Sequence, residues 1–167
     1  MYRRIDDFVQ DWALEAEATL KALRGLTDAA LAQRVTPEGR AAGRLAWHVA
    51  QTIPEMMGTA GLKGVEGPGE HDPVPAGAAE IAEAYARAAD SVGRAVQSQW
   101  SDDELGDEIP MYGEMWAKGG TLGILVKHQA HHRGQLTVLM RQAGLAVPGC
   151  YGPAREEWAW LGMPAMD

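Results

Sequence analysis

The chain has 167 residues, of which 46% are hydrophobic and 23% charged, and its formal net charge is -8 at pH 7. These values are typical of one globular domain, so we expect a single domain spanning residues 1–167 rather than a disordered or fibrous chain. The negative charge, without any dense cluster of Lys and Arg, disfavours a nucleic-acid partner because phosphate backbones would be repelled.

Helical periodicity predicts two long helices in the first half of the chain. Apolar residues recur at the spacing of one helix face from about residue 3 to 24 and again from about 41 to 59. Between these stretches, Thr27 is expected to cap a short turn, because its side-chain oxygen can accept from the free amides that open a helix. Pro54 is expected to kink the second helix, because proline has no amide hydrogen to donate.

The second half is predicted to contain two more long helices. A loop of Gly, Pro and acidic residues at 61–75 precedes the third helix, which is expected at about 77–100. Residues 101–120 are interpreted as a turn followed by an irregular excursion. The fourth helix is expected from Thr121 to Gly144, where glycine can form the C-cap.

A short extra helix is expected near the C-terminal end, from Pro153 to about Leu161. The fixed φ of proline suits the first helical position, and its missing amide needs no partner there. No segment shows a convincing strand pattern. The predicted fold class is therefore all-α, an antiparallel four-helix bundle with a short C-terminal helix.

The fourth predicted helix carries two histidines on one face. Projection at about 3.6 residues per turn places His132 within the apolar stripe and His128 at its edge, whereas His131 falls on the opposite side. Residues four apart on a helix have Cβ atoms roughly 5 to 6 Å apart, so His128 and His132 can reach one ion. The pair of His128 and His131 is also adjacent, but it would draw the site toward the polar face, where solvent competes. His48 borders the apolar stripe of the second helix and is the candidate third ligand.

Two interpretations of these histidines remain open on spacing alone. A histidine near an apolar stripe is often a hydrogen-bonded core residue, and histidines four apart occur by chance in many helices. A metal site is favoured because burying several imidazoles without partners is costly, and one shared ion satisfies all of them. Three histidines with an open fourth position are typical of catalytic zinc sites, and imidazole also suits nickel, iron and copper.

The cysteine content and the N-terminal sequence bear on the cellular compartment in which we expect the protein. Cys150 is the only cysteine, which excludes an internal disulfide and a cysteine-based zinc knuckle and fits a reducing environment. No stretch approaches the roughly 20 uninterrupted apolar residues of a membrane span, and no apolar signal segment opens the chain. We therefore expect a cytoplasmic protein with no membrane partner.

The residues around the histidines resemble a known family. The DinB/YfiT-like superfamily has a C-terminal motif similar to HQAHHRGQL at 128–136, GLAVP at 144–148 and YGP at 151–153. Its motif around the first histidine is similar to LAWHVA at 45–50, and the order of helices is similar over nearly the whole chain. These are metal-binding proteins, unrelated to the DNA polymerase that shares the name.

The resemblance implies a set of ligands and several properties of the protein. The family's three metal-binding histidines correspond to His48, His128 and His132, and His131 would not be a ligand. The implied cofactor is one divalent transition metal, zinc or nickel first, with iron, manganese or cobalt as alternatives, and the implied assembly is a homodimer. Characterised relatives include transferases and isomerases that use mycothiol or bacillithiol, and others are assigned as hydrolases.

Three functions follow as alternatives. In the first, the metal binds a low-molecular-weight thiol, lowers its pKa and presents the thiolate to an electrophilic small-molecule substrate. In the second, the same position activates water for hydrolysis, and in the third the protein is a non-catalytic metal-binding stress-response protein. Glu55, on the His48 side of its helix, is a candidate proton acceptor, although a solvated surface carboxylate is its more ordinary interpretation. Gln135, beside His128 on the helical net, is a candidate contact to a ligand or substrate.

Overall fold

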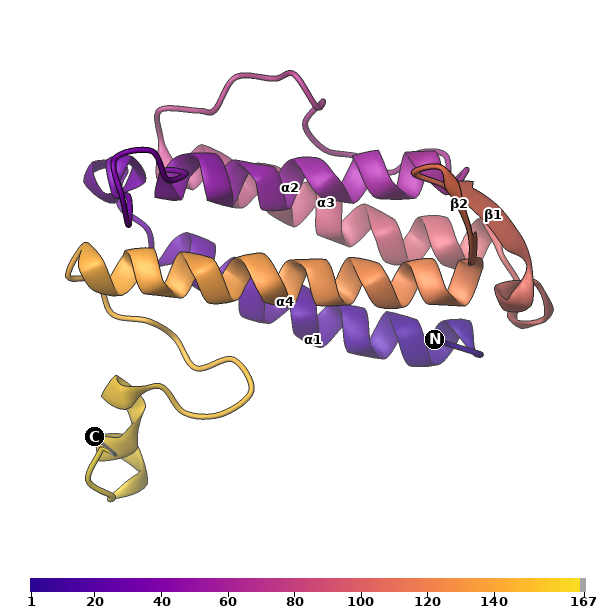
Figure 1. Cartoon of the computed structure of the whole chain (residues 1–167). Coiled ribbons are helices and arrows are strands. Elements are labelled where there is room, and N and C mark those ends of the chain that lie inside the picture. Colours follow the sequence, from indigo (N-terminus) through magenta and orange to yellow (C-terminus); the bar gives the residue numbers. More distant parts are fainter. Residues whose placement is uncertain (166–167) are drawn as a thin grey trace.

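The computed structural model describes residues 1–165 and is mostly helical, with one small two-stranded sheet (Figure 1). The long helices are α1 (Ile5–Arg24), α2 (Ala42–Thr59), α3 (Ala78–Gln99) and α4 (Lys118–Gln142). Short 3-10 helices are η1 (Asp28–Ala32), η2 (Asp102–Gly106) and η3 (Arg155–Leu161). Both α1 and α2 contact α3 and α4, so each long helix packs against two others.

The apolar faces predicted from periodicity form the core between these helices. In α1, Phe8 and Trp12 are buried one turn apart, and the Trp12 indole donates to Ala89 O in α3 at 2.9 Å. Side chains from all four helices are fully buried in this core, among them Phe8, Leu23, Val49, Ile53, Ile81, Tyr85, Leu122, Leu125 and Leu136. Burial of each such side chain stabilises the fold by roughly 1.5–3 kcal/mol. No described helix is both long enough and apolar enough to cross a membrane.

The predicted cap at Thr27 is confirmed, and the fourth long helix ends within two residues of the predicted Gly144. The Thr27 hydroxyl oxygen accepts from Ala30 N at 3.3 Å and caps η1. Gly144 follows the end of α4 with a φ of 75°, a conformation that glycine adopts without a steric penalty. Pro54 lies inside α2, and the helix continues beyond it to Thr59.

The start of α4 differs from the prediction. The helix begins at Lys118, three residues before Thr121, even though two glycines lie in its first turn. The reason is a tertiary contact: Tyr2 N donates to Gly119 O at 3.1 Å, and a side chain at Gly119 would clash with Tyr2 O. Glycine at this point allows close packing with the N-terminal segment, which helix propensity alone does not show.

The expectation of an irregular segment without strands before α4 was wrong. Strands β1 (Glu108–Met111) and β2 (Glu114–Ala117) pair antiparallel, with Met111 opposite Glu114. Tyr112 and Gly113 connect them with φ of 52° and 87°, as a tight hairpin turn with positive φ at both central residues requires. Pro110 obscured the strand pattern, but proline is tolerated in a two-stranded ribbon because each strand has one free edge.

The terminal helix, in contrast to α4, begins later than predicted. It is the 3-10 helix η3, which starts two residues beyond Pro153 at Arg155. The Glu157 carboxylate accepts from Ala154 N at 2.8 Å and from Gly149 N at 3.0 Å, so a side chain rather than proline fixes the helix start. Figure 1 shows this C-terminal segment extending away from the long helices, and η3 contains no buried residue.

Candidate metal centre

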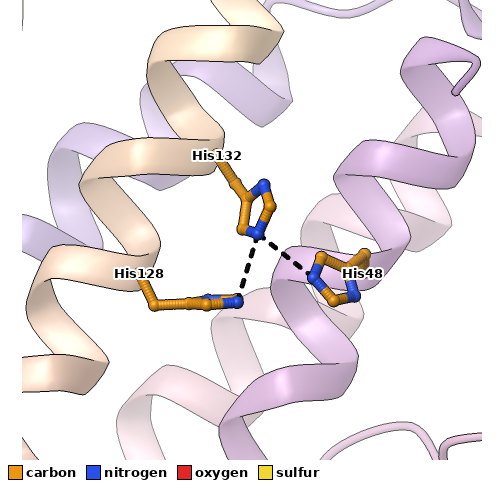
Figure 2. Close-up of side chains that lie close together, drawn as sticks. All are labelled: His48, His128 and His132. Carbon is orange, nitrogen blue, oxygen red and sulfur yellow. Dashed lines mark hydrogen bonds between the residues drawn. The ribbon is translucent and has the colours of Figure 1, made fainter. Parts of the chain in front are cut away.

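Three histidines converge between α2 and α4. His48 comes from α2, and His128 and His132 lie one turn apart on α4, with their rings directed toward one another (Figure 2). His132 Nε2 is 3.2 Å from His48 Nε2 and 3.1 Å from His128 Nε2. One ring nitrogen of each residue lies within 4.8 Å of the other two. The structure therefore brings together the three residues that the sequence singled out.

This arrangement fits a divalent transition metal. Zinc binds histidine nitrogens at about 2.0–2.1 Å in tetrahedral sites, which places pairs of ligand nitrogens roughly 3.3 Å apart. The two Nε2 separations of 3.1 and 3.2 Å are close to that spacing. Within residues 1–165, no fourth histidine, cysteine or carboxylate joins the group. Three histidines around one tetrahedral ion would leave a fourth coordination position for a small molecule.

The surroundings keep the rings in the neutral form that metal ligands need. Burial lowers the pKa of His48 from its ordinary value of 6.5 to about 4, and repulsion from His132 and His128 adds to this effect. Burial likewise lowers the pKa of His128 to about 4, with further repulsion from His132. The pKa of His132 is also lowered, first by burial. At neutral pH each ring therefore has a free lone pair.

Gln135 determines which nitrogen of His132 carries the proton. Gln135 Oε1 lies 2.8 Å from His132 Nδ1 and accepts its hydrogen, which leaves Nε2 unprotonated and facing the other two rings. Gln135 Nε2 in turn lies 3.1 Å from His131 Nε2 and donates to it. Gln135, predicted beside His128, thus contacts His132, and His131 lies outside the cluster on the exposed side.

Thr52 lies next to His128. Its hydroxyl donates to Val49 O at 3.2 Å, and its oxygen is 3.5 Å from His128 Nδ1. A hydrogen on Nδ1 can therefore point at the Thr52 oxygen while Nε2 faces the cluster. Thr52 follows His48 by four residues, about one helical turn, but this spacing gives no indication of the contact with His128.

Glu55 lies beyond the ligand cluster but lines the same cavity as His48. Its two carboxylate oxygens accept from the Tyr112 hydroxyl at 2.8 and 3.1 Å, so the hairpin turn is tied to α2. Burial, followed by the Glu55 hydrogen bond and charge, raises the pKa of Tyr112. The sequence did not reveal Tyr112, because it lies in the segment without helical periodicity.

A buried ion pair joins α4 to α1 at the residue that follows His132. Arg133, 2% exposed, pairs with Glu15 of α1, 3% exposed, and Arg133 Nη1 also donates to Thr19 Oγ1 at 2.9 Å. The Tyr151 hydroxyl donates to Glu15 Oε2, and the Tyr151 ring lies 5.0 Å from the guanidinium carbon. Sequence reasoning missed this network, although the position of Arg133 beside His132 and three residues before Leu136 places it near the core face.

Two arginines near the cluster were also missed. Arg40 lines the cavities that contain His132 and His48, and Arg44 lines the latter. The positive charge of Arg40 contributes to the lowered pKa of all three clustered histidines. Their spacing could have indicated this position, because Arg40 and Arg44 precede His48 by eight and four residues, the separations that place side chains on one helix face.

The fold and the cluster together define a helical protein with a candidate three-histidine metal centre. The chain belongs to the DinB family, whose sequence model matches residues 1–166. It is 44% identical over 165 residues to the uncharacterized protein YrdA of Bacillus subtilis (strain 168), covering 99% of this chain and 98% of that protein.

Solved structures agree with this assignment. The crystal structure of a DinB-like protein from Bacillus cereus ATCC 10987 has a TM-score of 0.86 and 43% sequence identity, covering 90% of this chain and all of that one. A DinB-like protein of Bacillus subtilis, YjoA, has a TM-score of 0.64 at 17% identity, covering 83% of this chain and 92% of that one. At this lower identity the similarity is one of fold alone.

Proposed function

We propose that the protein is a metal-dependent enzyme in which His48, His128 and His132 bind one divalent transition metal, zinc or nickel. The proposed reaction is the transfer of a low-molecular-weight thiol to a small electrophilic substrate. The observation that carries the proposal is the convergence of three neutral ring nitrogens at separations that suit one ion. We further propose that the four long helices form an antiparallel four-helix bundle that holds the site between α2 and α4.

The residues of the chain have distinct roles in this reaction. His48, His128 and His132 would hold a divalent ion, which would supply Lewis acidity to lower the pKa of a bound thiol. Gln135 keeps the proton of His132 on Nδ1, so that Nε2 remains a donor to the ion. Glu55 lines the cavity beside His48, and its carboxylate is the proposed acceptor of the thiol proton.

Hydrolysis is the second candidate, and the position of Glu55 is the observation that favours it. A carboxylate in the cavity next to His48 can act as general base toward water as well as toward a thiol. The two reactions use the same three histidines and differ in the nucleophile. The two reactions can be distinguished by whether turnover requires an added thiol, and not by replacing a residue of the site.

The first experiment is elemental analysis of untagged purified protein beside His48→Ala, His128→Ala and His132→Ala. We expect about one equivalent of metal in the parent and none in the three variants, because two histidines hold an ion far less tightly than three. His71→Ala is the matched control, since His71 is exposed in the loop after α2, and it should retain the metal. A parent that stays folded and cannot be loaded with zinc or nickel contradicts the proposal.

The second experiment distinguishes the reactions. The metal-loaded protein is incubated with 1-chloro-2,4-dinitrobenzene in the presence and absence of cysteine or glutathione, and with 4-nitrophenyl acetate without thiol. Thiol transfer predicts arylation of the thiol above the uncatalysed rate and no ester cleavage. Ester cleavage without thiol favours hydrolysis, and stoichiometric metal binding with neither activity favours a non-catalytic metal-binding protein.

We also propose that the protein is a homodimer. Several large apolar side chains are exposed in one copy, including Leu14 at 69% and Trp160 at 83%. A second copy would remove such surface from water, which is the usual driving force for subunit association. Light scattering coupled to gel filtration tests this, and a monomer at micromolar concentration contradicts it.

A further inference from the structure

Two cavities border the histidine cluster, and Arg40 lines both. The larger, about 580 Å³, contains His132 and Gln135 in its wall, and the smaller, about 250 Å³, contains His48. Arg40 therefore lies between the two approaches to the cluster. A molecule in the larger cavity therefore lies in a space that Arg40 and His132 both line.

The charge of Arg40 is not neutralised by the protein. Within the part of the chain that the structure describes, neither Arg40 nor Arg44 forms an ion pair with a carboxylate. Arg44 donates to Gln51 Oε1 at 2.7 Å, whereas Arg40 has no comparable side-chain partner among the described contacts. In a chain with a net charge of -8, an unpaired guanidinium at the entrance to a site is suited to attract an anion.

The two cavities differ in the charges they present. Glu55 and Glu70 line the smaller one together with the two arginines, so the two negative charges offset the two positive charges there. Among residues 1–165, no acidic side chain lines the larger cavity, and Arg40 is the one lysine or arginine in its wall. A single guanidinium balances the charge of one carboxylate and can donate to both of its oxygens, whereas a dianionic phosphate would keep a net negative charge.

The rest of the larger cavity is mostly apolar. Four aliphatic side chains contribute to its wall: Val35, Leu45, Val138 and Leu139. Val35 and Val138 are 59% and 50% exposed, so the cavity presents aliphatic surface that a ligand can cover. Apolar walls combined with a few polar groups that fix orientation are typical of small-molecule sites.

We propose that the larger cavity binds an amphiphilic carboxylate, with its charged group at Arg40 and its apolar part along Val35, Leu45 and Val138. That this ligand is the substrate of the histidine centre rests on the proposed function, whereas its binding to Arg40 does not. The orientation places the ligand's reactive part beside His132, which lines the same cavity. Arg40 is then a specificity residue that selects anionic over neutral substrates.

The test is an NMR titration of the isotope-labelled full chain, zinc-loaded and zinc-free, with hexanoate, acetate, 1-hexanol and inorganic phosphate. We expect hexanoate to shift the signals of Gly39 and of the Gln135 side-chain amide, with at least about tenfold tighter binding than acetate because of its additional methylenes. 1-Hexanol and phosphate should each bind more weakly than hexanoate, because each lacks one of the two features that the cavity matches.

Variants at Arg40 identify the charge contact. Arg40→Gln should weaken hexanoate about fivefold, the upper range for an exposed ion pair, and Arg40→Lys should retain most of the affinity. Arg87→Gln is the matched control, because Arg87 is exposed on α3 and lies outside the wall of the cavity, and it should leave binding unchanged.

The outcomes separate this inference from the proposed function. Arg40-dependent hexanoate binding to zinc-free protein supports the inference even if no metal is found in the purified protein. Binding that needs zinc and is unchanged in Arg40→Gln indicates that the carboxylate contacts only the ion, which overturns the inference and leaves the metal centre intact. Equal binding of 1-hexanol, or no binding of any probe, also overturns it.

Discussion

Replacement of Gln135 tests the contribution of this side chain to the proposed metal binding by His132. Gln135 Oε1 accepts from His132 Nδ1 at 2.8 Å, and Gln135→Ala removes this acceptor without altering the three clustered rings. Hydrogen-bond partners of metal-binding histidines typically contribute roughly 10–100-fold to metal affinity. Because Gln135 is exposed and water can replace part of the lost bond, we expect the lower end, about tenfold or ~1.4 kcal/mol.

The measurement is the zinc dissociation constant at neutral pH, by competition with a chromogenic chelator. Gln135→Glu keeps an acceptor and should bind zinc at least as tightly as the parent, because a carboxylate strengthens the hydrogen bond. Gln97→Ala, on an exposed position of α3, is the matched control and should have no effect. Unchanged affinity in Gln135→Ala, or an equal loss in Gln97→Ala, would refute the proposed role of Gln135.

Three further predictions concern stability. Gly119→Ala should lower the free energy of unfolding by about 1–3 kcal/mol in urea, because the new Cβ would meet Tyr2 O. Gly134→Ala, on the same helix with no atom within 4 Å of its Cβ position, should be neutral or stabilising. Similar effects of the two substitutions would contradict the packing argument. Arg133→Met leaves a buried carboxylate unpaired and should cost about 3–5 kcal/mol; a loss below about 1 kcal/mol would show that the carboxylate is not buried as described. Because the pKa of His48 is held at about 4, below 6.5, the unfolded chain binds a proton in this interval that the folded chain does not. The free energy of unfolding of the metal-free protein should therefore decrease as the pH falls from 6.5 toward 4, and this decrease should be smaller in His48→Gln. An equal decrease in the parent and the variant would contradict the prediction.

The long helices could be predicted because periodicity reports directly on burial. Apolar residues at helical spacing, such as Phe8 and Trp12 in α1, do lie in the core. The hairpin at 108–117 could not be predicted in the same way, since each strand has four residues and one includes Pro110. The early start of α4 depends on contact with Tyr2, which is distant in sequence, and local propensity does not contain that information.

The three histidines of the candidate site could be predicted from the sequence, but the contacts around them could not. His128 and His132 share a helix, so their proximity follows from helix geometry, and the residues around His48 resembled the family motif. The contact between Gln135 and His132 depends on side-chain conformations. The position of Arg40 depends on the segment before α2, where no periodic pattern constrains the chain. Spacing and the family motif therefore identified the candidate ligands, and only the folded structure shows which side chains orient them and line the cavities beside them.

The approach of His48 to the α4 histidines depends on the register between two helices. Gln129, fully buried and adjacent to His128, donates through Nε2 to Val49 O at 3.2 Å, and Val49 is adjacent to His48. A slip of one helical turn would move the helices by about 5.4 Å, more than the separation of the ring nitrogens, and would break both this bond and the cluster. An unpaired polar group in the core is costly, so the buried Nε2 favours the register in which it donates to Val49 O, whereas Gln129 Oε1 has no partner among the described residues. The same contact that aligns α2 with α4 therefore brings the histidines together, which couples the fold of this protein to its candidate metal centre.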